Sequence, residues 1–257
     1  MDRDELLQQA FDRSAVLQLD TQRYRNFVED FFALQLQSDL WVTGDITSRI
    51  LMPSGSRTTA RIFAQEPGIA AGLAEVQFFI EKNDLQVQLL LNDGERIKKN
   101  TALMEIHGDR RLILMLERTA VNALQRMSGI ATVTHRLRQL VQVPIAATRK
   151  TLWGLIDKKA VAVGGGLTHR LGVEDAILIK SNHLDLLKKS GAADPVLAAL
   201  ETAWKRRTES TFIEVEVRDL AEAAAAAKIM DRLRSEDPDY PLLIMFDNFS
   251  VPHLRAA

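Results

Sequence analysis

Apolar side chains recur at helical spacing in several stretches of the first half of the chain. Residues 22–38 place apolar side chains on one face and predict an amphipathic helix. A second helix is expected over 69–80. The longest pattern covers 111–141, with an interruption expected near Ser128 and Gly129. Short strand patterns lie between these helices, at residues 58–65, 86–91 and 104–106. This order predicts an N-terminal α/β layer that a long helix connects to a second domain.

From residue 140 onward, the apolar runs end in polar or charged side chains that could take part in binding or catalysis. Four runs do so: 144–147 before Thr148, Arg149 and Lys150; 176–179 before Lys180; 211–217, which contains Glu214 and Glu216; and 242–246 before Asp247. Helical stretches separate the runs, so βαβ units and a parallel sheet are predicted. Functional groups at the carboxyl ends of such strands build the site of a β/α barrel. The alternative is that the strands simply end in polar residues at the surface.

Composition narrows the class of protein. The chain has 257 residues, 33 Lys plus Arg and 34 Asp plus Glu, a net charge of -1, and 46% hydrophobic residues. Disorder is excluded, and the basic excess of a nucleic-acid binder is missing. No cysteine is present, which removes thiolate zinc sites and thiol nucleophiles. No apolar run approaches the ~18 residues of a membrane span, and no signal peptide is recognisable. A cytoplasmic protein without membrane or nucleic-acid partners is expected.

Five potential cations fall within about thirty residues of this nearly neutral chain. They are Arg149, Lys150, His169, Arg170 and Lys180. If their strands are neighbours, mutual repulsion makes the arrangement costly without an anion. Arg binds carboxylate or phosphate through two parallel hydrogen bonds, and Lys acts as a point charge. An anionic substrate with several charges is therefore predicted. The alternative is a set of solvated surface charges, which is the expectation for Lys158 and Lys159.

Acidic residues accompany this cluster. In a strand, Glu214 and Glu216 share one face, while Ile213, Val215 and Val217 share the other. In a barrel, the carboxylate face would line the lumen. With Asp247, these carboxylates suit Mg²⁺, which commonly uses one or two carboxylates plus substrate phosphates. They also suit hydrogen bonds to sugar hydroxyls. A structural ion pair of one glutamate with Lys180 is the alternative.

The glycine triplet 164–166 follows an apolar stretch and precedes His169 and Arg170. Glycine lets a backbone approach a ligand closely, and it also makes flexible turns. The triplet matches neither a dinucleotide-binding fingerprint nor a P-loop. The triplet could therefore be either a ligand contact or a flexible turn.

Taken together, these motifs resemble a known family. The segments that carry the resemblance are 44–48 (GDITS), 117–122 (ERTAVN), 128–132 (SGIAT), 148–151 (TRKT), 164–170 (GGGLTHR), 179–183 (IKSNH), 214–216 (EVE) and 246–249 (FDNF). In this order they are similar to quinolinate phosphoribosyltransferase, also called nicotinate-nucleotide pyrophosphorylase (carboxylating). The match extends over nearly the whole chain.

The resemblance implies a two-domain α/β fold. An N-terminal α/β sandwich is expected over residues 1–113, and an irregular, incomplete α/β barrel over 114–257. It also implies conversion of quinolinate and phosphoribosyl pyrophosphate, with Mg²⁺, to nicotinate mononucleotide, pyrophosphate and carbon dioxide. A homodimer or higher homo-oligomer with shared active sites is expected, in which Arg118 is lent to the partner's site.

Roles for the site residues follow from the same resemblance. Lys150, Lys180, Glu216 and Asp247 are the expected catalytic residues, and Glu216 and Asp247 are the expected metal ligands. The expected substrate-binding residues are Arg118, Thr148, Arg149, Lys150, His169, Arg170 and Lys180.

Some positions depart from the family pattern. Ala147 and Ser181 stand where the family has Asp, and Leu152-Trp153-Gly154 replaces Thr-Pro-Gly. The chain ends at Ala257, whereas family members continue, so a C-terminal segment that grips the ribose 5-phosphate is expected to be missing. Two alternatives therefore accompany the enzymatic expectation. One is a related protein of molybdenum uptake that acts on another acceptor, and the other is a truncated relative without catalytic activity.

Overall fold

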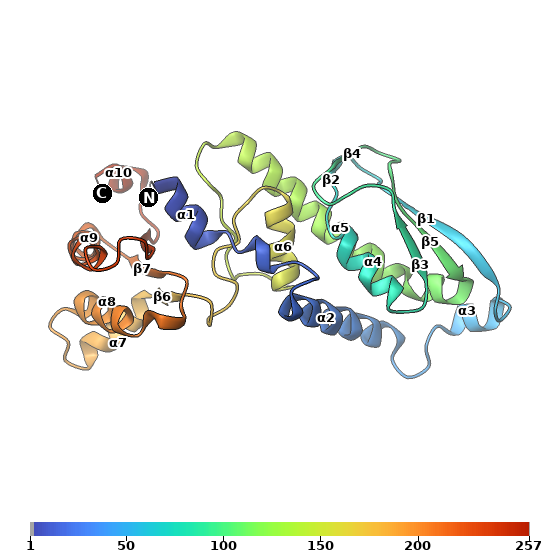
Figure 1. Cartoon of the computed structure of the whole chain (residues 1–257), viewed down its shortest axis with the longest axis horizontal. Coiled ribbons are helices and arrows are strands. Elements are labelled where there is room, and N and C mark those ends of the chain that lie inside the picture. The colour runs from blue at the N-terminus through green and yellow to red at the C-terminus, as the bar shows by residue number, and fades with distance from the viewer. Residues whose placement is uncertain (1–2, 257) are drawn as a thin grey trace. The chain divides into compact units, whose positions relative to one another are not determined.

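The computed structural model describes residues 3–256 and contains two compact units. The antiparallel-sheet unit holds residues 13–169. The parallel-sheet unit holds the described residues up to Asp12 and those from Arg170 onward. Figure 1 colours the chain in sequence order, so the blue N-terminal helix and the orange and red elements belong to the parallel-sheet unit. The domain boundary implied at residues 113 and 114 falls within helix α5 (Arg110–Leu140) and stays a prediction.

The antiparallel-sheet unit alternates helices with short strands. Its elements are η1 (Ser14–Val16), α2 (Gln22–Leu40), α3 (Ile46–Leu51), β1 (Arg57–Phe63), β2 (Gly68–Ile69), α4 (Leu73–Glu81), β3 (Gln86–Leu89), β4 (Arg96–Ile97), β5 (Ala102–Asp109), α5 (Arg110–Leu140) and α6 (Leu155–Val163). The helix expected from residue 69 begins later, at Leu73. Gly72, which precedes it, adopts a φ of +89°, a conformation that glycine tolerates without steric cost.

Strand β5 lies at the centre of the antiparallel sheet, whose order is β1-β5-β3. Thr59 pairs with His107, and Val87 pairs with Ile106. The strand expected at 104–106 is therefore longer than the sequence pattern indicated, because it has partners on both sides. Met104 and Ile106 are buried, and helices α4 and α5 pack against the sheet (Figure 1). A short second sheet pairs β2 with β4.

Helix α5 runs for 31 residues without a break. The Asp109 carboxylate caps it by accepting hydrogen bonds from the backbone N–H groups of Arg111 and Leu112, at 2.8 and 3.3 Å. The interruption expected near Ser128 and Gly129 is wrong. A glycine costs a helix interior about 1 kcal/mol relative to alanine, which the buried apolar face of so long a helix outweighs.

The parallel-sheet unit has the βα alternation that the sequence predicted. Its elements are α1 (Arg3–Phe11), β6 (Ile177–Ile179), α7 (Ser181–Lys189), α8 (Pro195–Lys205), η2 (Arg207–Glu209), β7 (Ile213–Val217), α9 (Leu220–Arg234), β8 (Leu242–Phe246) and α10 (Val251–Ala256). The strands form one parallel sheet in the order β6-β7-β8. The strand expected at 144–147 is reduced to a single parallel bridge between Ala146 and Leu167, in the other unit. Among the described helices, none is both long and apolar enough to cross a membrane.

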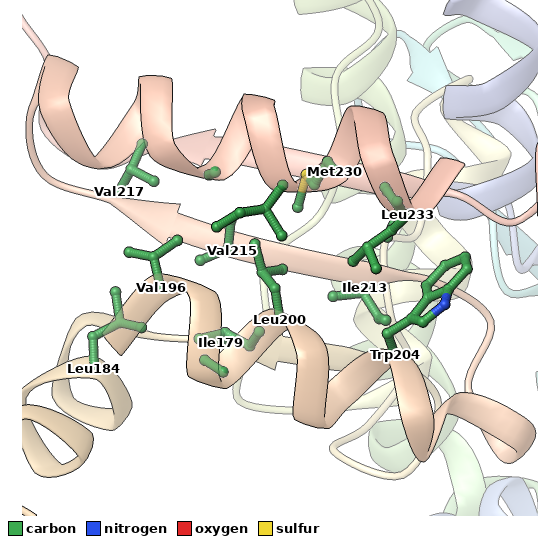
Figure 2. Packing of buried hydrophobic residues seen from close by; sticks show 14 of the residues in the cluster. Ile179, Leu184, Val196, Leu200, Trp204, Ile213, Val215, Val217, Met230 and Leu233 are labelled. Atoms are coloured by element: carbon green, nitrogen blue, oxygen red, sulfur yellow. The ribbon is translucent and has the colours of Figure 1, made fainter. Parts of the chain in front are cut away.

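The core of the parallel-sheet unit forms on one face of β7. Ile213, Val215 and Val217 are fully buried there, and helices α8 and α9 supply Leu200, Met230 and other apolar side chains (Figure 2). The alternation predicted for this strand is therefore confirmed. Because one face is committed to the core, Glu214 and Glu216 are directed to the opposite face.

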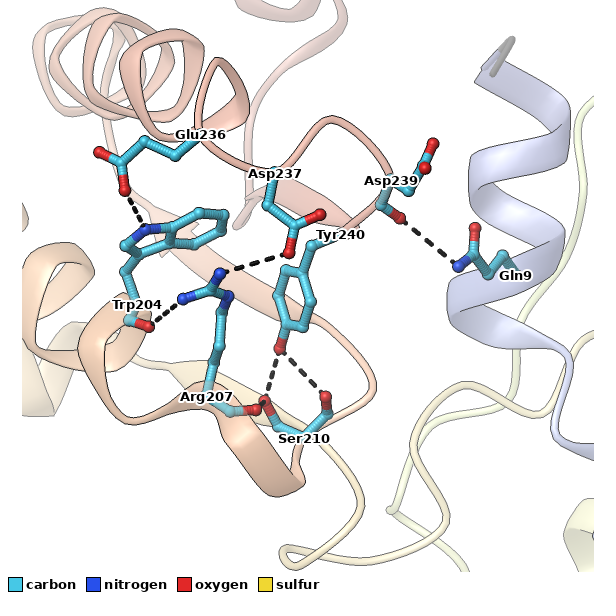
Figure 3. Close-up of polar contacts among 8 residues, drawn as sticks. All are labelled: Gln9, Trp204, Arg207, Ser210, Glu236, Asp237, Asp239 and Tyr240. Atoms are coloured by element: carbon cyan, nitrogen blue, oxygen red, sulfur yellow. Dashed lines mark hydrogen bonds and ion pairs between the residues drawn. The ribbon is translucent and has the colours of Figure 1, made fainter.

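The loop that leads into β8 is anchored by polar contacts (Figure 3). The indole N–H of Trp204 donates to Glu236 at 2.8 Å, and the Arg207 guanidinium pairs with Asp237 at 3.3 Å. The same guanidinium lies 3.6 Å from the centre of the Trp204 ring. Tyr240 OH forms a 2.5 Å hydrogen bond to the hydroxyl of Ser210, which lies between η2 and β7. These contacts fix where β8 begins, and hence where Asp247 follows its carboxyl end.

Candidate active site

Three predicted catalytic residues lie at the same edge of the parallel sheet. Lys180 directly follows β6, Glu216 lies near the end of β7, and Asp247 directly follows β8. The register places Ile179 opposite Val215, and the Asp247 backbone N–H donates to the Val217 carbonyl at 3.0 Å. The carboxyl ends of parallel strands are where α/β proteins place ligand-binding groups. The structure therefore brings Lys180, Glu216 and Asp247 together at this edge.

The two glutamates of β7 differ in burial. Glu214 is 4% exposed, whereas Glu216, nearer to the carboxyl end, is half-buried. Lys180 is also half-buried and forms no ion pair with Glu216 in the described part of the chain. Glu216 is thus the glutamate of this strand that is better placed to meet a ligand at the sheet edge.

His169 and Arg170 are neighbours in sequence but belong to different units. His169 is half-buried with a φ of +51°, which is uncommon for a residue other than glycine. Arg170 is 6% exposed, and its Nη1 donates to the Ala176 carbonyl at 3.1 Å. A buried guanidinium held by backbone is a fixed cation rather than a mobile surface group.

The segment of Thr148, Arg149 and Lys150 is an exposed loop of the antiparallel-sheet unit. The Lys150 backbone N–H donates to Thr148 Oγ1 at 3.1 Å, a local turn that sets the direction of both side chains. Thr148 and Lys150 line an open cleft of about 410 Å³. The cleft is completed by Arg126, Ile130, Ala147, Thr151, Leu152, Asp157, Lys158 and Val161.

Arg126 and Asp157 form a bidentate ion pair beside this cleft. Arg126 Nε lies 2.7 Å from Asp157 Oδ1, and Nη2 lies 2.7 Å from Oδ2. Burial raises the pKa of Asp157, but the hydrogen bonds from Arg126, Thr151 and the Trp153 backbone outweigh it and leave the pKa below its ordinary value. The hydrogen bond to Asp157 raises the pKa of Arg126. Sequence reasoning missed this pair, because 31 positions separate its members.

Arg118 is exposed on helix α5 and lines a second, smaller cavity of about 180 Å³. The other lining residues are Phe31, Gln35, Ser38, Asp39, Thr119, Asn122 and Trp153. The rings of Phe31 and Trp153 lie 4.9 Å apart between their centres. Arg118 is therefore an exposed cation in a cavity that the Phe31 and Trp153 rings also line. This cavity is separate from the cleft that Thr148 and Lys150 line.

Lys158 and Lys159 are not the solvated surface charges that the sequence suggested. They are 1% and 8% exposed. Lys158 Nζ donates to the Thr168 carbonyl at 2.5 Å, and Lys159 Nζ donates to Gln18 Oε1 at 3.1 Å. The expectation fails because both partners lie outside the helix that carries the lysines. Lys158 adds a buried cation to the wall of the larger cleft.

The glycine triplet terminates helix α6 and lets it approach helix α5. A Cβ atom on Gly164 would lie 2.5 Å from the Ala131 carbonyl oxygen, and one on Gly166 would lie 2.7 Å from a methyl group of Val161. Gly165 adopts a φ of +84° in open space. Close helix packing and a helix end therefore account for the triplet without a ligand.

The acidic residues at the sheet edge are the candidates for a metal site. No group of three or more histidine or acidic side chains arranged to hold a metal occurs among residues 3–256. Mg²⁺ does not need such a group, because it keeps water ligands and takes one or two carboxylates together with substrate phosphates. The donor chemistry of Glu216 and Asp247 at neighbouring strand ends fits that requirement.

An α/β fold with charged side chains at the carboxyl ends of parallel strands is typical of proteins that bind small ligands at that edge. Family comparison narrows this class. The family model described as quinolinate phosphoribosyl transferase, N-terminal domain, matches residues 45–128, and the C-terminal domain model matches residues 130–257. The chain belongs to the quinolinate phosphoribosyltransferase family.

Individual relatives agree with this membership. A probable nicotinate-nucleotide pyrophosphorylase (carboxylating) from Methanocaldococcus jannaschii is 37% identical over 221 residues, which cover 83% of this chain and 71% of the relative. Quinolinate phosphoribosyltransferase (decarboxylating) 2a, mitochondrial, from Nicotiana tabacum is 32% identical over 224 residues, covering 85% of this chain and 62% of the relative. The chain thus spans roughly two thirds of the length of these relatives.

Solved structures show the same fold. NadC from Streptococcus pyogenes superposes with a TM-score of 0.73 at 29% identity, covering 89% of this chain and 78% of that chain. The nicotinate-nucleotide pyrophosphorylase from Francisella tularensis gives a TM-score of 0.69 at 30% identity, covering 88% and 85%. The expected α/β fold class is therefore confirmed.

Proposed function

We propose that this protein transfers the phosphoribosyl group of phosphoribosyl pyrophosphate to quinolinate in NAD biosynthesis. The products are nicotinate mononucleotide, pyrophosphate and carbon dioxide, so the protein is a pentosyltransferase. One observation carries the proposal: Lys180, Glu216 and Asp247 share one edge of the parallel sheet, in a chain that belongs to this family. Cations suit the two carboxylates of quinolinate, and carboxylates suit a ribose whose charge becomes positive in the transition state.

Binding would use the cationic side chains. Arg149 and Arg170 suit the quinolinate carboxylates, because guanidinium and carboxylate form two parallel hydrogen bonds. Lys150 and Lys180 suit the region between the two substrates, where point charges meet carboxylate and pyrophosphate. Thr148 and His169 complete the proposed substrate contacts as further hydrogen-bond donors. Mg²⁺, held by Glu216 and Asp247, would neutralise charge on the pyrophosphate when bound.

The reaction needs no covalent nucleophile from the protein. The bond between C1 of the ribose and the pyrophosphate oxygen breaks, and the pyridine nitrogen attacks C1 and forms the new bond. Glu216 and Asp247 offset the positive charge that develops on the ribose. The carbon–carbon bond to the adjacent carboxylate then breaks and carbon dioxide leaves. Its electron pair stays on the ring carbon, where the neighbouring positively charged nitrogen stabilises it, and this carbon takes up a proton. Lys150 is proposed to orient the departing carboxylate.

A homodimer with shared sites is part of the proposal. Arg118 is exposed and lies in a cavity separate from the cleft beside Lys150, which supports a role outside its own subunit's cleft. A cytoplasmic location is proposed from the composition alone.

The first test is formation of nicotinate mononucleotide from quinolinate, phosphoribosyl pyrophosphate and Mg²⁺. Product that depends on all three supports the proposal. No product from a chain that nevertheless binds quinolinate would favour a non-catalytic binder. Thermal protection by another anionic heterocycle, and none by quinolinate, would favour a different acceptor.

Shared sites predict complementation between inactive variants. Arg118→Ala and Lys150→Ala should each lose most activity, because each removes a proposed substrate ligand. An equimolar mixture of the two variants should regain up to about a quarter of wild-type activity, since statistical mixing makes half the dimers hybrid and each hybrid has one of its two sites intact. The measurement is turnover after co-refolding of the two variants. Activity no higher than in either variant alone, with mixed dimers demonstrated, would exclude a shared site.

A further inference from the structure

One buried carboxylate binds two groups of the loop that carries Thr148, Arg149 and Lys150. Asp157, in the first turn of helix α6, accepts hydrogen bonds from three groups. Arg126 donates through Nε and Nη2, each at 2.7 Å, and the Trp153 backbone N–H donates to Oδ2 at 3.2 Å. The Thr151 hydroxyl is the third donor. Two of these donors belong to the loop itself, and Asp157 is only 6% exposed.

Trp153 adds a second attachment for the same loop. The Arg126 guanidinium lies 4.9 Å from the centre of the Trp153 ring, and the Phe31 ring lies 4.9 Å from it on helix α2. Arg126 thus contacts both Asp157 and the indole that ends the loop. Leu152 and Thr151 line the larger cleft and Trp153 lines the smaller cavity, so the shape of this loop helps to form both.

We propose that Asp157 is a positioning residue, which holds residues 148–153 in the conformation that presents Thr148, Arg149 and Lys150 to an anionic substrate. The substrate part of this inference rests on the proposed function. Arg149 and Lys150 are exposed and make no ion pair in the described part of the chain, so nothing but the loop backbone sets their position. Charge-assisted, bidentate hydrogen bonds to a buried carboxylate are suited to this task, because they are stronger and more directional than neutral ones.

A simpler interpretation is that Asp157 only stabilises the start of helix α6. An acidic residue in the first turn favours a helix, through backbone N–H groups and the helix dipole. That role would not require Arg126 or the Thr151 hydroxyl. The two interpretations differ in a measurable way: a helix-stabilising residue affects the whole unit, whereas a positioning residue affects the loop and ligand binding selectively.

Limited proteolysis with trypsin separates these interpretations without any ligand. Trypsin cleaves after Arg149 and Lys150 in the loop, and after Lys98 and Lys99 in an exposed turn of the same unit, which serves as an internal control. In Asp157→Asn, cleavage at 149 and 150 should rise about 10- to 100-fold, the range expected for losing hydrogen bonds to a charged group. Cleavage at 98 and 99 should stay within about twofold of wild type.

Ligand binding provides the second readout. The dissociation constant for quinolinate should rise about tenfold or more in Asp157→Asn, and turnover should show a larger rise in KM than fall in kcat. Glu29→Gln is the matched control, because it breaks the exposed 2.8 Å ion pair with Lys82 in the same unit and should change neither readout. If Asp157→Asn does not fold, Thr151→Val removes one loop donor and should give a smaller rise that is still selective.

The outcomes separate the two proposals. Equal rises at both trypsin regions, or none at 149 and 150, would overturn the positioning role. Selective cleavage in a protein whose wild type binds no quinolinate would support the positioning role and overturn the proposed acceptor. Selective cleavage with unchanged quinolinate affinity and KM would show that loop order does not serve the substrate, and would overturn the inference.

Discussion

Replacing Gly164 by alanine should test whether close packing of helices α5 and α6 accounts for the glycine triplet. The added Cβ would lie 2.5 Å from the Ala131 carbonyl oxygen and 2.8 Å from Thr134 Cβ. Normal carbon–oxygen contacts are longer, and a helix carbonyl cannot move as the tip of a flexible side chain does. One of the two helices must therefore shift. Overpacking of this kind costs about 1–3 kcal/mol of unfolding free energy, which we expect for Gly164→Ala.

Two other glycines give matched controls for the same added methyl group. Gly165 has open space but a φ of +84°, so Gly165→Ala should cost about 1–2 kcal/mol through backbone strain alone. Gly129 lies within α5 with nothing within 4 Å, so Gly129→Ala should stabilise by about 0.5–1 kcal/mol. Urea denaturation followed by circular dichroism measures all three. A Gly164→Ala protein as stable as wild type would refute the packing argument. Loss of quinolinate binding without loss of stability would revive a ligand role for the triplet.

Two further predictions concern buried residues. Burial raises the pKa of Glu75, and the nearby Asp93 raises it further. The folded protein therefore favours the neutral carboxyl, and this contribution to the unfolding free energy is present at low pH and is lost as the pH rises through the raised pKa. Glu75→Gln should therefore gain unfolding free energy relative to wild type between about pH 4 and pH 8, and a pH-independent difference in urea midpoints would contradict this. Leu200→Ala should lose about 2–5 kcal/mol of unfolding free energy, because Leu200 is fully buried in the core beside β7. Thermal and urea unfolding measure the loss. A loss below about 1 kcal/mol would show that the core closes around the cavity.

Elements governed by local periodicity were predictable from the sequence. The alternation in β7 fixed both the apolar face of Ile213 and Val215 and the opposite face of Glu216, because side chains alternate strictly along a strand. The positions of Lys180 and Asp247 followed from the rule that parallel strands end at one edge. Residues that usually interrupt helices were a less reliable guide. Ser128 and Gly129 suggested a break, but tertiary packing kept α5 continuous.

Features that depend on distant partners could not be predicted. Lys159 is buried because Gln18, 141 positions away, accepts its hydrogen bond. Arg126 and Asp157 meet across 31 positions and two helices, and neither carries a sequence signal of its own. Resemblance to a family supplied roles for individual residues, but it did not indicate which buried pair holds the loop that carries them. Only the three-dimensional structure reveals such pairs, because the fold, and not the neighbouring sequence, brings the two side chains together.

The unbroken course of helix α5 has a consequence for how sequences in this family can diverge. Arg118 and Arg126 are eight positions apart, which on an α-helix is about 12 Å along the axis and about 80° around it. That offset lets one helix supply the walls of two different cavities. Inserting one residue between them would turn one arginine by about 100° relative to the other. Length changes should therefore be excluded from this interval.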